Sequence, residues 1–409
     1  MAARAWRGWG YGFRALRHRD FRALWIGLVV SAVGTWMQIV AQSLLVLRLS
    51  HGSAFALGCV SLAQACAFLL FALLGGGFAD RLNRRRLLIA SQSSLGLLAT
   101  ILGFLTTTGV ITVPVIAAVA FVSGAILSFD QPARAALLSS VVPPEDLLNA
   151  ISLQSAVFNG AAIAGPALAG LVVNWIGLAA DFFLNSLSFV PVLVALALVP
   201  SAPSVAGQRE KLINQIREGL EAVRHDPVLV SALASYGILL FAGPSLQLLL
   251  PVLAVGRLHV GASMLGFLFS AAGVGAVIGA LIVGGVREAN VRLARAAIVC
   301  WGAALALTGT AIMAPITFCA LVVLAACQSI VGSSTSAFLQ SRVAAQQRGR
   351  VMSLNTLLVM GVRPLGDFPA GAIIAAIGAP ITAAGAALVV GIVGWLIYTR
   401  ALRSQSSRA

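Results

Sequence analysis

The sequence predicts an all-α integral membrane protein with twelve transmembrane helices in two six-helix, pseudo-symmetric halves. Three observations lead to this prediction. Of the 409 residues, 59% are hydrophobic and only 10% are charged, whereas about a quarter of the residues of a soluble domain are charged. The apolar residues form runs that reach the ~20 residues needed to cross a bilayer as a helix. Finally, residues of the first half recur in the second half at a fixed separation.

The basic residues follow these apolar runs. A formal net charge of +15 raises the alternative of nucleic-acid binding, but basic segments that alternate with bilayer-length runs are better explained by membrane topology. With both termini placed in the cytoplasm, every Lys and Arg falls in a cytoplasmic segment except Arg48 and Arg257, which fall outside, and Arg363, which falls within a span. We therefore expect cytoplasmic termini, contact with membrane lipid and no nucleic-acid partner.

The chain opens with residues 1–20, a basic amphipathic N-terminal segment in which arginines alternate with aromatic residues. It lacks the apolar core and the cleavage site of a signal peptide. We expect it to lie on the inner leaflet, with a disordered basic tail as the open alternative. Residues 21–199 follow as the first half, with spans expected at 23–47, 55–79, 87–108, 112–133, 149–174 and 177–198.

Residues 200–227 are the longest polar segment and predict a cytoplasmic linker with an amphipathic helix, because Leu212, Ile216 and Val223 recur on one helical face. The second half, residues 228–400, precedes a cytoplasmic tail at 401–409. Its spans are expected at 228–255, 261–285, 293–313, 315–338, 350–377 and 380–399.

The two halves behave as repeats. A shift of 201 residues pairs Gly165 with Gly366 and Gly170 with Gly371, at equivalent places in spans five and eleven. Two six-span repeats related by a central axis are typical of secondary transporters, with a substrate site between them near the bilayer midplane.

Residues 75–86, between spans two and three, read GGGFADRLNRRR. This segment resembles the G-x-L-A-D-R-x-G-R-R signature of the major facilitator superfamily, with Asn83 in place of the last glycine, a mild change because Asn tolerates the left-handed conformation. The resemblance implies a conformational switch in which Asp80 meets the start of span eleven near Gly349 and Arg350. A plain topology anchor is the alternative. The switch residues are Gly76, Asp80, Arg81, Arg84 and Arg85.

Further segments resemble the bacterial exporter branch of this superfamily, which includes enterobactin exporters and macrolide-efflux-like proteins. They include residues 34–38, 129–134, 158–159, 185–189 and 348–353. Gly165, Pro166 and Gly170 also resemble the antiporter motif of drug exporters. Physically, proline bends a helix and glycine admits a close neighbour, so an ordinary packing kink is the alternative.

The sequence departs from that branch at charged positions. The branch often carries W-M-Q-R-V-A-Q-D in span one and F-N-L-A-R in span five, but the charged positions are here Ile39, Ser43 and Ala162. Span eleven instead holds Arg363 and Asp367, one turn apart. Ionisable groups inside spans are functional hypotheses by default. Asp367 is therefore a proton-coupling candidate with Arg363 as its partner or as an anion contact; a self-satisfied pair is the equal alternative.

Asp130 and Arg134 form a second pair with the same spacing. We expect them near the cytoplasmic end of span four, as a gate or interface pair more than as a coupling site. Asp181, near the periplasmic start of span six, is expected to face water and is a weak candidate.

Polar side chains inside the spans predict a cavity for a small-molecule substrate. Ser31, Thr35, Gln38 and Gln42 recur on one stripe of span one, for which interhelical hydrogen bonding is the alternative. The other cavity candidates are Trp36, Asn159, Tyr236, Gln247 and Gln328.

No enzymatic motif accompanies these features. The four histidines lack ligand spacing, and the five cysteines lie in apolar runs without metal-like spacing. We expect no enzyme activity, cofactor or metal. The sequence predicts a monomeric, proton-coupled exporter in a bacterial cytoplasmic membrane, exporting a siderophore or, second, a hydrophobic drug. A non-coupled facilitator or a transporter-like scaffold is the alternative.

Overall fold

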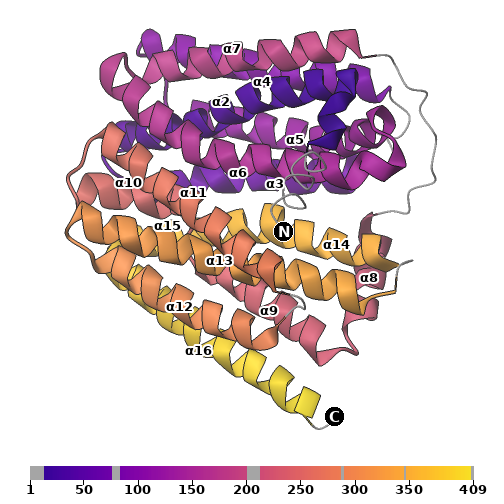
Figure 1. Ribbon diagram of the computed structural model, residues 1–409. Helices are drawn as coiled ribbons and strands as arrows, with labels where there is room; N and C mark the ends of the chain where they lie inside the picture. Colours follow the sequence, from indigo (N-terminus) through magenta and orange to yellow (C-terminus); the bar gives the residue numbers. More distant parts are fainter. Residues whose placement is uncertain (1–12, 76–82, 200–211, 287–289, 345–346, 407–409) are drawn as a thin grey trace, which may run out of the picture.

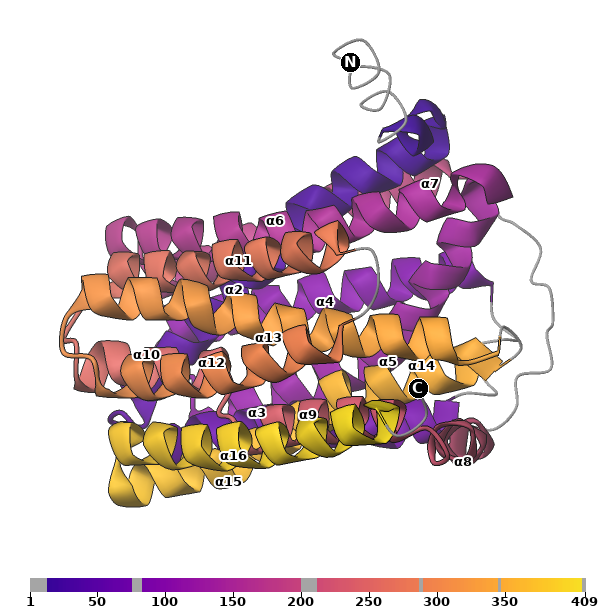
Figure 2. The ribbon, with the colours of Figure 1, turned by 60° about the horizontal axis from the view of Figure 1, so that its bottom comes forward.

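The computed structural model describes residues 13–75, 83–199, 212–286, 290–344 and 347–406. Within these residues, twelve segments are helical, long and apolar enough to cross a membrane, and no strand occurs. The predicted all-α fold with twelve spans is confirmed. Figure 1 shows the helices running roughly parallel, with those of the first half above those of the second. Figure 2 shows the same bundle from a direction turned by 60°.

The first half starts with a short 3-10 turn, η1 (Arg14–Arg17), and continues with six long helices. These are α2 (Arg19–Leu49), α3 (Ala54–Gly75), α4 (Arg84–Thr107), α5 (Val113–Val141), α6 (Pro144–Trp175) and α7 (Leu178–Leu198). The helices α5 and α6 are longer than expected, because α5 ends at Val141 rather than near residue 133 and α6 begins at Pro144 rather than near residue 149.

The second half has six spans, two of which are interrupted. The uninterrupted ones are α11 (Ala262–Gly285), α12 (Val291–Thr310), α13 (Ala314–Arg342) and α16 (Ala379–Ser406). Span seven divides into α9 (Pro227–Ala242) and α10 (Leu246–Gly256). Span eleven consists of α14 (Arg348–Leu357), the π-helical η4 (Leu358–Val362) and α15 (Arg363–Ile377).

Both interruptions have a local cause. Gly243 and Pro244 separate α9 from α10; proline disfavours the helical conformation of the residue before it, and Gly243 has an extended backbone. The Ser245 hydroxyl then caps α10 by accepting from the Leu248 N–H at 3.2 Å. In span eleven, the wider π turn ends at Val362, and α15 then begins with Arg363 and Pro364, which lacks an N–H.

The helix α8 (Leu212–Val223) follows the segment that connects the halves, and it packs against α14. Glu218 of α8 forms an ion pair with Arg350, and a Cβ at Gly219 would come within 2.8 Å of the Arg350 carbonyl oxygen. Figure 1 places α8 beside α14, at the end of the bundle. The amphipathic helix expected between the halves thus corresponds to α8, which lies against the start of span eleven.

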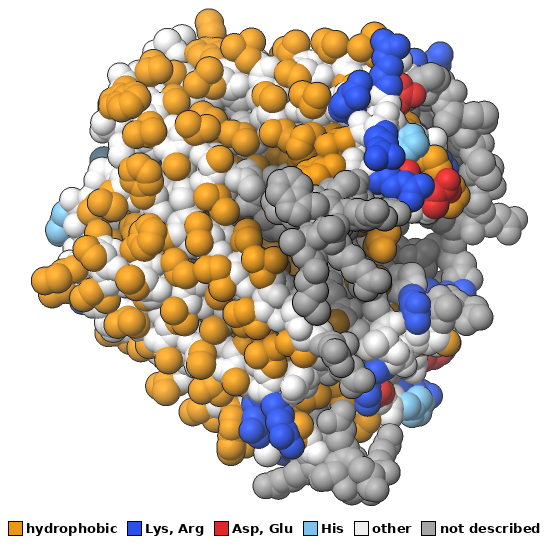
Figure 3. Space-filling view, in the orientation of Figure 1, with side chains coloured by type: hydrophobic (Ala, Val, Ile, Leu, Met, Phe, Trp, Pro, Cys, Tyr) orange, Lys and Arg blue, Asp and Glu red, His pale blue; other side chains and the backbone are white. Residues whose placement is uncertain are grey.

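Most of the outer surface is apolar. Large hydrophobic side chains such as Leu187, Leu281 and Leu388 are more than 60% exposed. Figure 3 shows hydrophobic side chains covering the face in view, with the charged side chains gathered near one end. A broad apolar surface bounded by charged residues is what a bilayer-spanning protein presents to lipid. The chain is a multi-pass membrane protein.

The two halves meet at one end of the bundle, which we call the packed end; it holds residues 50–53, 175–177 and 378. There α6 packs on α11 and α3 packs on α15, with no room for added carbon atoms between backbones: a Cβ at Gly371 would lie 2.7 Å from the Ala54 carbonyl oxygen. At the opposite end, which holds residues 83–86 and 342–350 and which we call the basic end, Gly284 and Gly285 of α11 adjoin open space. The glycines whose added Cβ would meet the backbone of the other half therefore lie toward the packed end.

Candidate functional site

A polar cavity of about 390 Å³ lies mainly in the first half, with Gln247 of α10 reaching it from the second half. It is lined by aromatic side chains, including Trp36, Phe158 and Phe189, and by many amide and hydroxyl groups. Cavities that bind small molecules combine apolar walls with a few placed polar groups in this way. The polar lining includes Ser31, Thr35, Gln38, Gln42, Ser61, Gln64, Gln92, Asp130, Gln131, Arg134, Asn185 and Gln247.

The predicted stripe of α2 forms one wall of this cavity. Ser31, Thr35, Gln38 and Gln42 all line it. The alternative expectation also has support, since Gln38 accepts a hydrogen bond of 2.5 Å from the amide of Asn185 on α7, and the Thr35 hydroxyl donates to the Ser31 carbonyl oxygen of its own helix at 2.8 Å. The stripe therefore faces the cavity and also ties α2 to α7.

Three of the predicted cavity residues lie elsewhere. Asn159 is exposed on α6, Gln328 is half-buried on α13, and Tyr236 is buried on α9. None of the three is among the residues that line this cavity. The Tyr236 hydroxyl instead lies against Gly332 of α13, where a Cβ would come within 2.9 Å of it.

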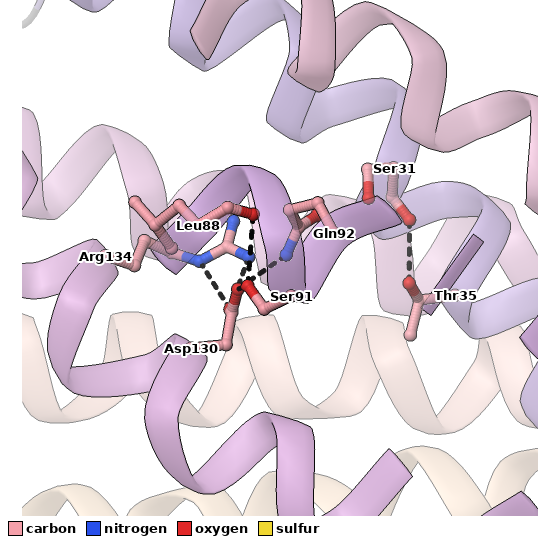
Figure 4. Close-up of polar contacts among 7 residues, drawn as sticks. All are labelled: Ser31, Thr35, Leu88, Ser91, Gln92, Asp130 and Arg134. Atoms are coloured by element: carbon pink, nitrogen blue, oxygen red, sulfur yellow. Dashed lines mark hydrogen bonds and ion pairs between the residues drawn. The ribbon is translucent and has the colours of Figure 1, made fainter. Parts of the chain in front are cut away.

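Asp130 and Arg134 line the cavity, and Figure 4 shows their side chains meeting each other beside Ser91 and Gln92. Asp130 is 2% exposed, and its Oδ2 accepts from Arg134 Nη2 at 2.7 Å. Its Oδ1 accepts from the Ser91 hydroxyl at 2.6 Å and from the Gln92 amide at 2.7 Å, both on α4. The carboxylate is thus paired and hydrogen-bonded on both oxygens, which is the condition for keeping a charge buried.

The position of this pair differs from the expectation. We expected Asp130 near the cytoplasmic end of span four, but α5 continues to Val141, so Asp130 lies well inside the helix. It joins α5 to α4 of the same half, and none of its hydrogen-bond partners belongs to the second half. The structure places the pair in the cavity wall and not at a helix end.

Asp367 lies at the break in span seven. It is 3% exposed, and its Oδ1 accepts a hydrogen bond of 2.9 Å from the backbone N–H of Ser245, the residue that caps α10. Arg363 precedes it by one turn and interacts electrostatically with Asp367 and with Tyr236. No ion pair within 4.0 Å joins Arg363 to Asp367. The acid therefore supports the start of α10 more directly than it pairs with its arginine.

Span five contributes the contact between the halves at the packed end. Because Pro166 has no N–H, the Ala162 carbonyl has no partner within α6; a Cβ at Gly273 of α11 would lie 2.7 Å from this oxygen. The Ser270 hydroxyl of α11 donates to the neighbouring Ile163 carbonyl at 2.6 Å, and Gly170 faces Ser263. Gly165 faces Trp36 of α2 instead, so Gly165 serves packing within the first half.

Of the five predicted switch residues, Gly76, Asp80 and Arg81 lie outside the described residues. Arg85 joins α4 to the end of α7, donating to the Leu196 and Ala197 carbonyl oxygens at 2.6 Å each, and Arg84 donates to the Ala136 carbonyl at 3.4 Å. The place of Asn83 at a glycine position suggested a left-handed backbone, but its φ is −62°. Its side chain caps α4 by accepting from the Arg85 and Arg86 N–H groups. The N-cap residue of a helix has a non-helical backbone such as this, and Asn is one of the residues preferred there.

Asp181 differs most from the expectation. We expected it to face water, but it is completely buried, and neither carboxylate oxygen has a hydrogen-bond partner. The chain turns at Gly177 with a φ of 118° before α7 begins at Leu178, and the first turn points Asp181 into the first half. The only signal in the sequence is an acid four residues after this glycine, on the same helical face as Asn185 and Ser188.

The comparisons with known proteins agree with this geometry. A profile of the transmembrane secretion effector family matches residues 11–409. The chain belongs to this family of major facilitator superfamily transporters. It is 29% identical over 248 residues to the uncharacterized MFS-type transporter y4rN of Sinorhizobium fredii (strain NBRC 101917 / NGR234), covering 58% of this chain and 60% of that protein.

Exporters are among its relatives. It is 25% identical over 272 residues to the enterobactin exporter EntS of Escherichia coli O1:K1 / APEC, covering 65% of this chain and 64% of the exporter. The matches thus span less than two thirds of the length of these relatives. Among solved structures, a bacterial homologue of the lysosomal transporter Spinster and one of the iron transporter ferroportin, both inward-facing, superpose with TM-scores of 0.71 and 0.72. The Spinster homologue is 14% identical and covers 95% of this chain and 97% of its own. The ferroportin homologue is 16% identical and covers 93% of this chain and 98% of its own. These superpositions establish the shared fold.

Proposed function

We propose that this transporter is a secondary active exporter of the bacterial cytoplasmic membrane, working by alternating access of its two halves around the polar cavity. One observation carries the proposal: the polar cavity lies mainly in the first half and is reached by Gln247 of the second, and the close backbone contacts between the two halves lie toward the packed end. With the basic end in the cytoplasm, as the positive-inside rule favours, both termini are cytoplasmic and the conformation is inward-facing, ready to receive a substrate from the cell.

The cavity lining favours a substrate that is partly aromatic and carries several hydrogen-bonding groups. Trp36, Phe158 and Phe189 offer rings for stacking, and the one acid of the lining is neutralised by Arg134. In the second half, Arg363 makes no hydrogen bond with any described residue and is half-buried, so its guanidinium could meet an anionic group of the substrate. A siderophore fits this combination best; a hydrophobic antibiotic is second.

We further propose that export is coupled to proton entry through Asp367. Its carboxylate accepts from the N–H of Ser245, where α10 begins, and α10 contacts α2 of the other half. A hydrogen bond to an ionised acceptor is roughly twice as strong as one to a neutral acceptor. Proton uptake by Asp367 would therefore weaken the support of α10 and release its contact with the first half.

Transport in reconstituted vesicles tests this function. Wild-type protein should move a catecholate siderophore faster when a proton gradient is imposed, and Asp367→Asn should lose this dependence while Asp367→Glu keeps it. Transport that is insensitive to the gradient in the wild type would favour a facilitator. The absence of transport for siderophores and hydrophobic antibiotics alike would favour a scaffold, and fully proton-dependent export by Asp367→Asn would overturn the role of Asp367.

The rocking of the halves has its own test on α11. Gly266 leaves no room for a side chain, because a Cβ there would collide with the Pro166 carbonyl of α6, whereas Gly284 on the same helix adjoins open space. Overpacking a tight contact costs about 1–3 kcal/mol. Gly266→Leu should therefore prevent closure of the packed end and lower transport at least tenfold, and the matched Gly284→Leu should leave it within twofold. Equal effects of the two variants would contradict this mechanism.

A further inference from the structure

Asp181 stands apart from the other buried acids of the described chain. Asp130 accepts from Arg134, Ser91 and Gln92, Asp146 accepts from Arg14 and His18, and Asp367 accepts from Ser245. Asp181 is 0% exposed and both of its oxygens are unpartnered. Of these four buried acids, Asp181 is therefore the least exposed, and it is also the one whose carboxylate has no hydrogen-bond or ion-pair partner.

No charge is placed to neutralise it. The helices packed against α7 are α2, α4 and, less extensively, α6. Their charged residues near the packed end are limited to Arg48 at the end of α2, which is exposed, followed in the connecting loop by His51, also exposed. The remaining charges of these three helices lie at the basic end, in residues 19–22, 84–86 and 145–146. A lone carboxylate in such surroundings costs several kcal/mol, so the neutral acid is the form that this conformation favours.

The repeat shows what this position requires. The 201-residue shift places Gly177 on Gly378, and both glycines have positive φ (118° and 86°) just before a helix, α7 or α16. The same shift places Asp181 on Thr382, which is also buried. The Thr382 hydroxyl donates to the carbonyl of Gly378 at 2.8 Å. A protonated carboxyl carries an O–H that can donate in the same manner, and a carboxylate carries none.

We propose that Asp181 is a proton-binding site that is occupied when the packed end is closed and that releases its proton when this end opens. Opening separates α10 from α2, the helix that packs most extensively on α7, and would admit water to the first turn of α7. There the carboxylate is hydrated and is stabilised by the positive end of the helix dipole. Proton binding at Asp181 thus stabilises the closed packed end. The binding of the proton is argued from the structure alone. Only the side of the membrane from which the proton arrives depends on the proposed function.

Infrared spectroscopy of the purified, full-length transporter in lipid tests the bound proton. The wild type at neutral pH should show a carboxylic-acid C=O band that Asp181→Asn lacks, that Asp181→Glu shifts, and that Asp367→Asn retains. Asp181→Thr, which copies the repeat, provides a second neutral variant if the amide folds poorly. Identical wild-type and Asp181→Asn bands would mean that the carboxyl is ionised, and would overturn the proposal.

Spin labels across the packed end test the consequence. Trp175, the last residue of α6, and Ile312, in the loop between α12 and α13, are exposed at this end, so Trp175→Cys and Ile312→Cys, in a background without the native cysteines, report its opening. One linked proton changes the open-to-closed ratio by up to about tenfold per pH unit. Raising the pH should open the wild type, whereas Asp181→Asn and Asp181→Thr should stay closed; a wild-type pH response in these variants would overturn the proposal. A protein that passes both tests yet exports nothing would overturn only the proposed function.

Discussion

The two halves of this transporter use a buried carboxylate in different ways. In the first half, Asp130 accepts from donors of its own helix α5 and of the neighbouring helix α4, and it stands in the cavity wall. In the second half, Asp367 has a single strong partner, the Ser245 N–H, at the break of span seven. The helices of the first half are continuous, while two spans of the second half are interrupted.

This difference suggests a division of labour. A carboxylate with a complete set of partners fixes the helices that bear it, because moving any of them leaves a buried charge uncompensated. A carboxylate that accepts one hydrogen bond from the start of a helix allows that helix to move when this single bond is broken. We therefore assign the stable wall of the cavity to the first half and the moving element to α10 of the second half. The variants below test that assignment in order of the size of their effect.

Removal of the Asp130 carboxylate should have the largest effect on stability. Asp130→Ala leaves Arg134 without its buried acceptor, and breaking a buried pair in this way costs about 3–5 kcal/mol. The free energy of unfolding in mixed micelles measures this loss. A double variant, Asp130→Leu with Arg134→Met, removes both charges and should recover most of the lost stability. If Asp130→Ala stays within about 1 kcal/mol of the wild type, Arg134 is hydrated by the cavity and the first half is not locked by this pair.

Removal of the Asp367 carboxylate should cost less. Asp367→Ala deprives the Ser245 N–H of its acceptor, and a hydrogen bond to a charged group contributes about 1.5–3 kcal/mol. Asp367→Asn keeps an acceptor oxygen and should recover part of this stability. Thermal unfolding of both variants measures the difference. Should Asn be as harmful as Ala, the charge facing Arg363 would matter more than the support of α10.

Much of the fold could be predicted from the sequence because bilayer-length apolar runs and the arginines between them depend on local composition. The glycine-rich contacts of Pro166 and Gly170 could also be anticipated, since proline and glycine act through backbone geometry. The break in span seven was missed, although Gly243 and Pro244 mark it. Hydropathy does not detect such a break, because the segments on both sides of it are equally apolar.

The site was predicted less completely, for physical reasons. The spacing of Arg363 and Asp367 suggested a pair, but the π turn before Arg363 and the donor at Ser245 come from the tertiary structure. Asp130 was placed wrongly because α5 is longer than its apolar run. Asp181 was expected to face water because it lies near a helix start, and only the packing of α7 on α2 and α4 shows that this start is buried.

The smallest effects come from neutral hydrogen bonds between helices of the same half. Asn185 donates to Gln38 at 2.5 Å between α7 and α2, and Asn355 donates to the Ser336 hydroxyl at 3.1 Å between α14 and α13. Such bonds contribute about 0.6 kcal/mol on average in membrane proteins. Asn185→Ala and Asn355→Ala should therefore each lower the free energy of unfolding by about this amount.

A double-mutant cycle with Gln38→Ala isolates the coupling of Asn185 from other losses. If the first half is the rigid wall of the cavity, this coupling should exceed the coupling of Asn355 with Ser336→Ala, because Asn355 belongs to the interrupted span eleven and its Oδ1 is left without a partner. Couplings of equal size would contradict the division of labour, since both halves would then hold their helices equally firmly. A larger coupling at Asn355 would reverse the assignment and make the second half the rigid one.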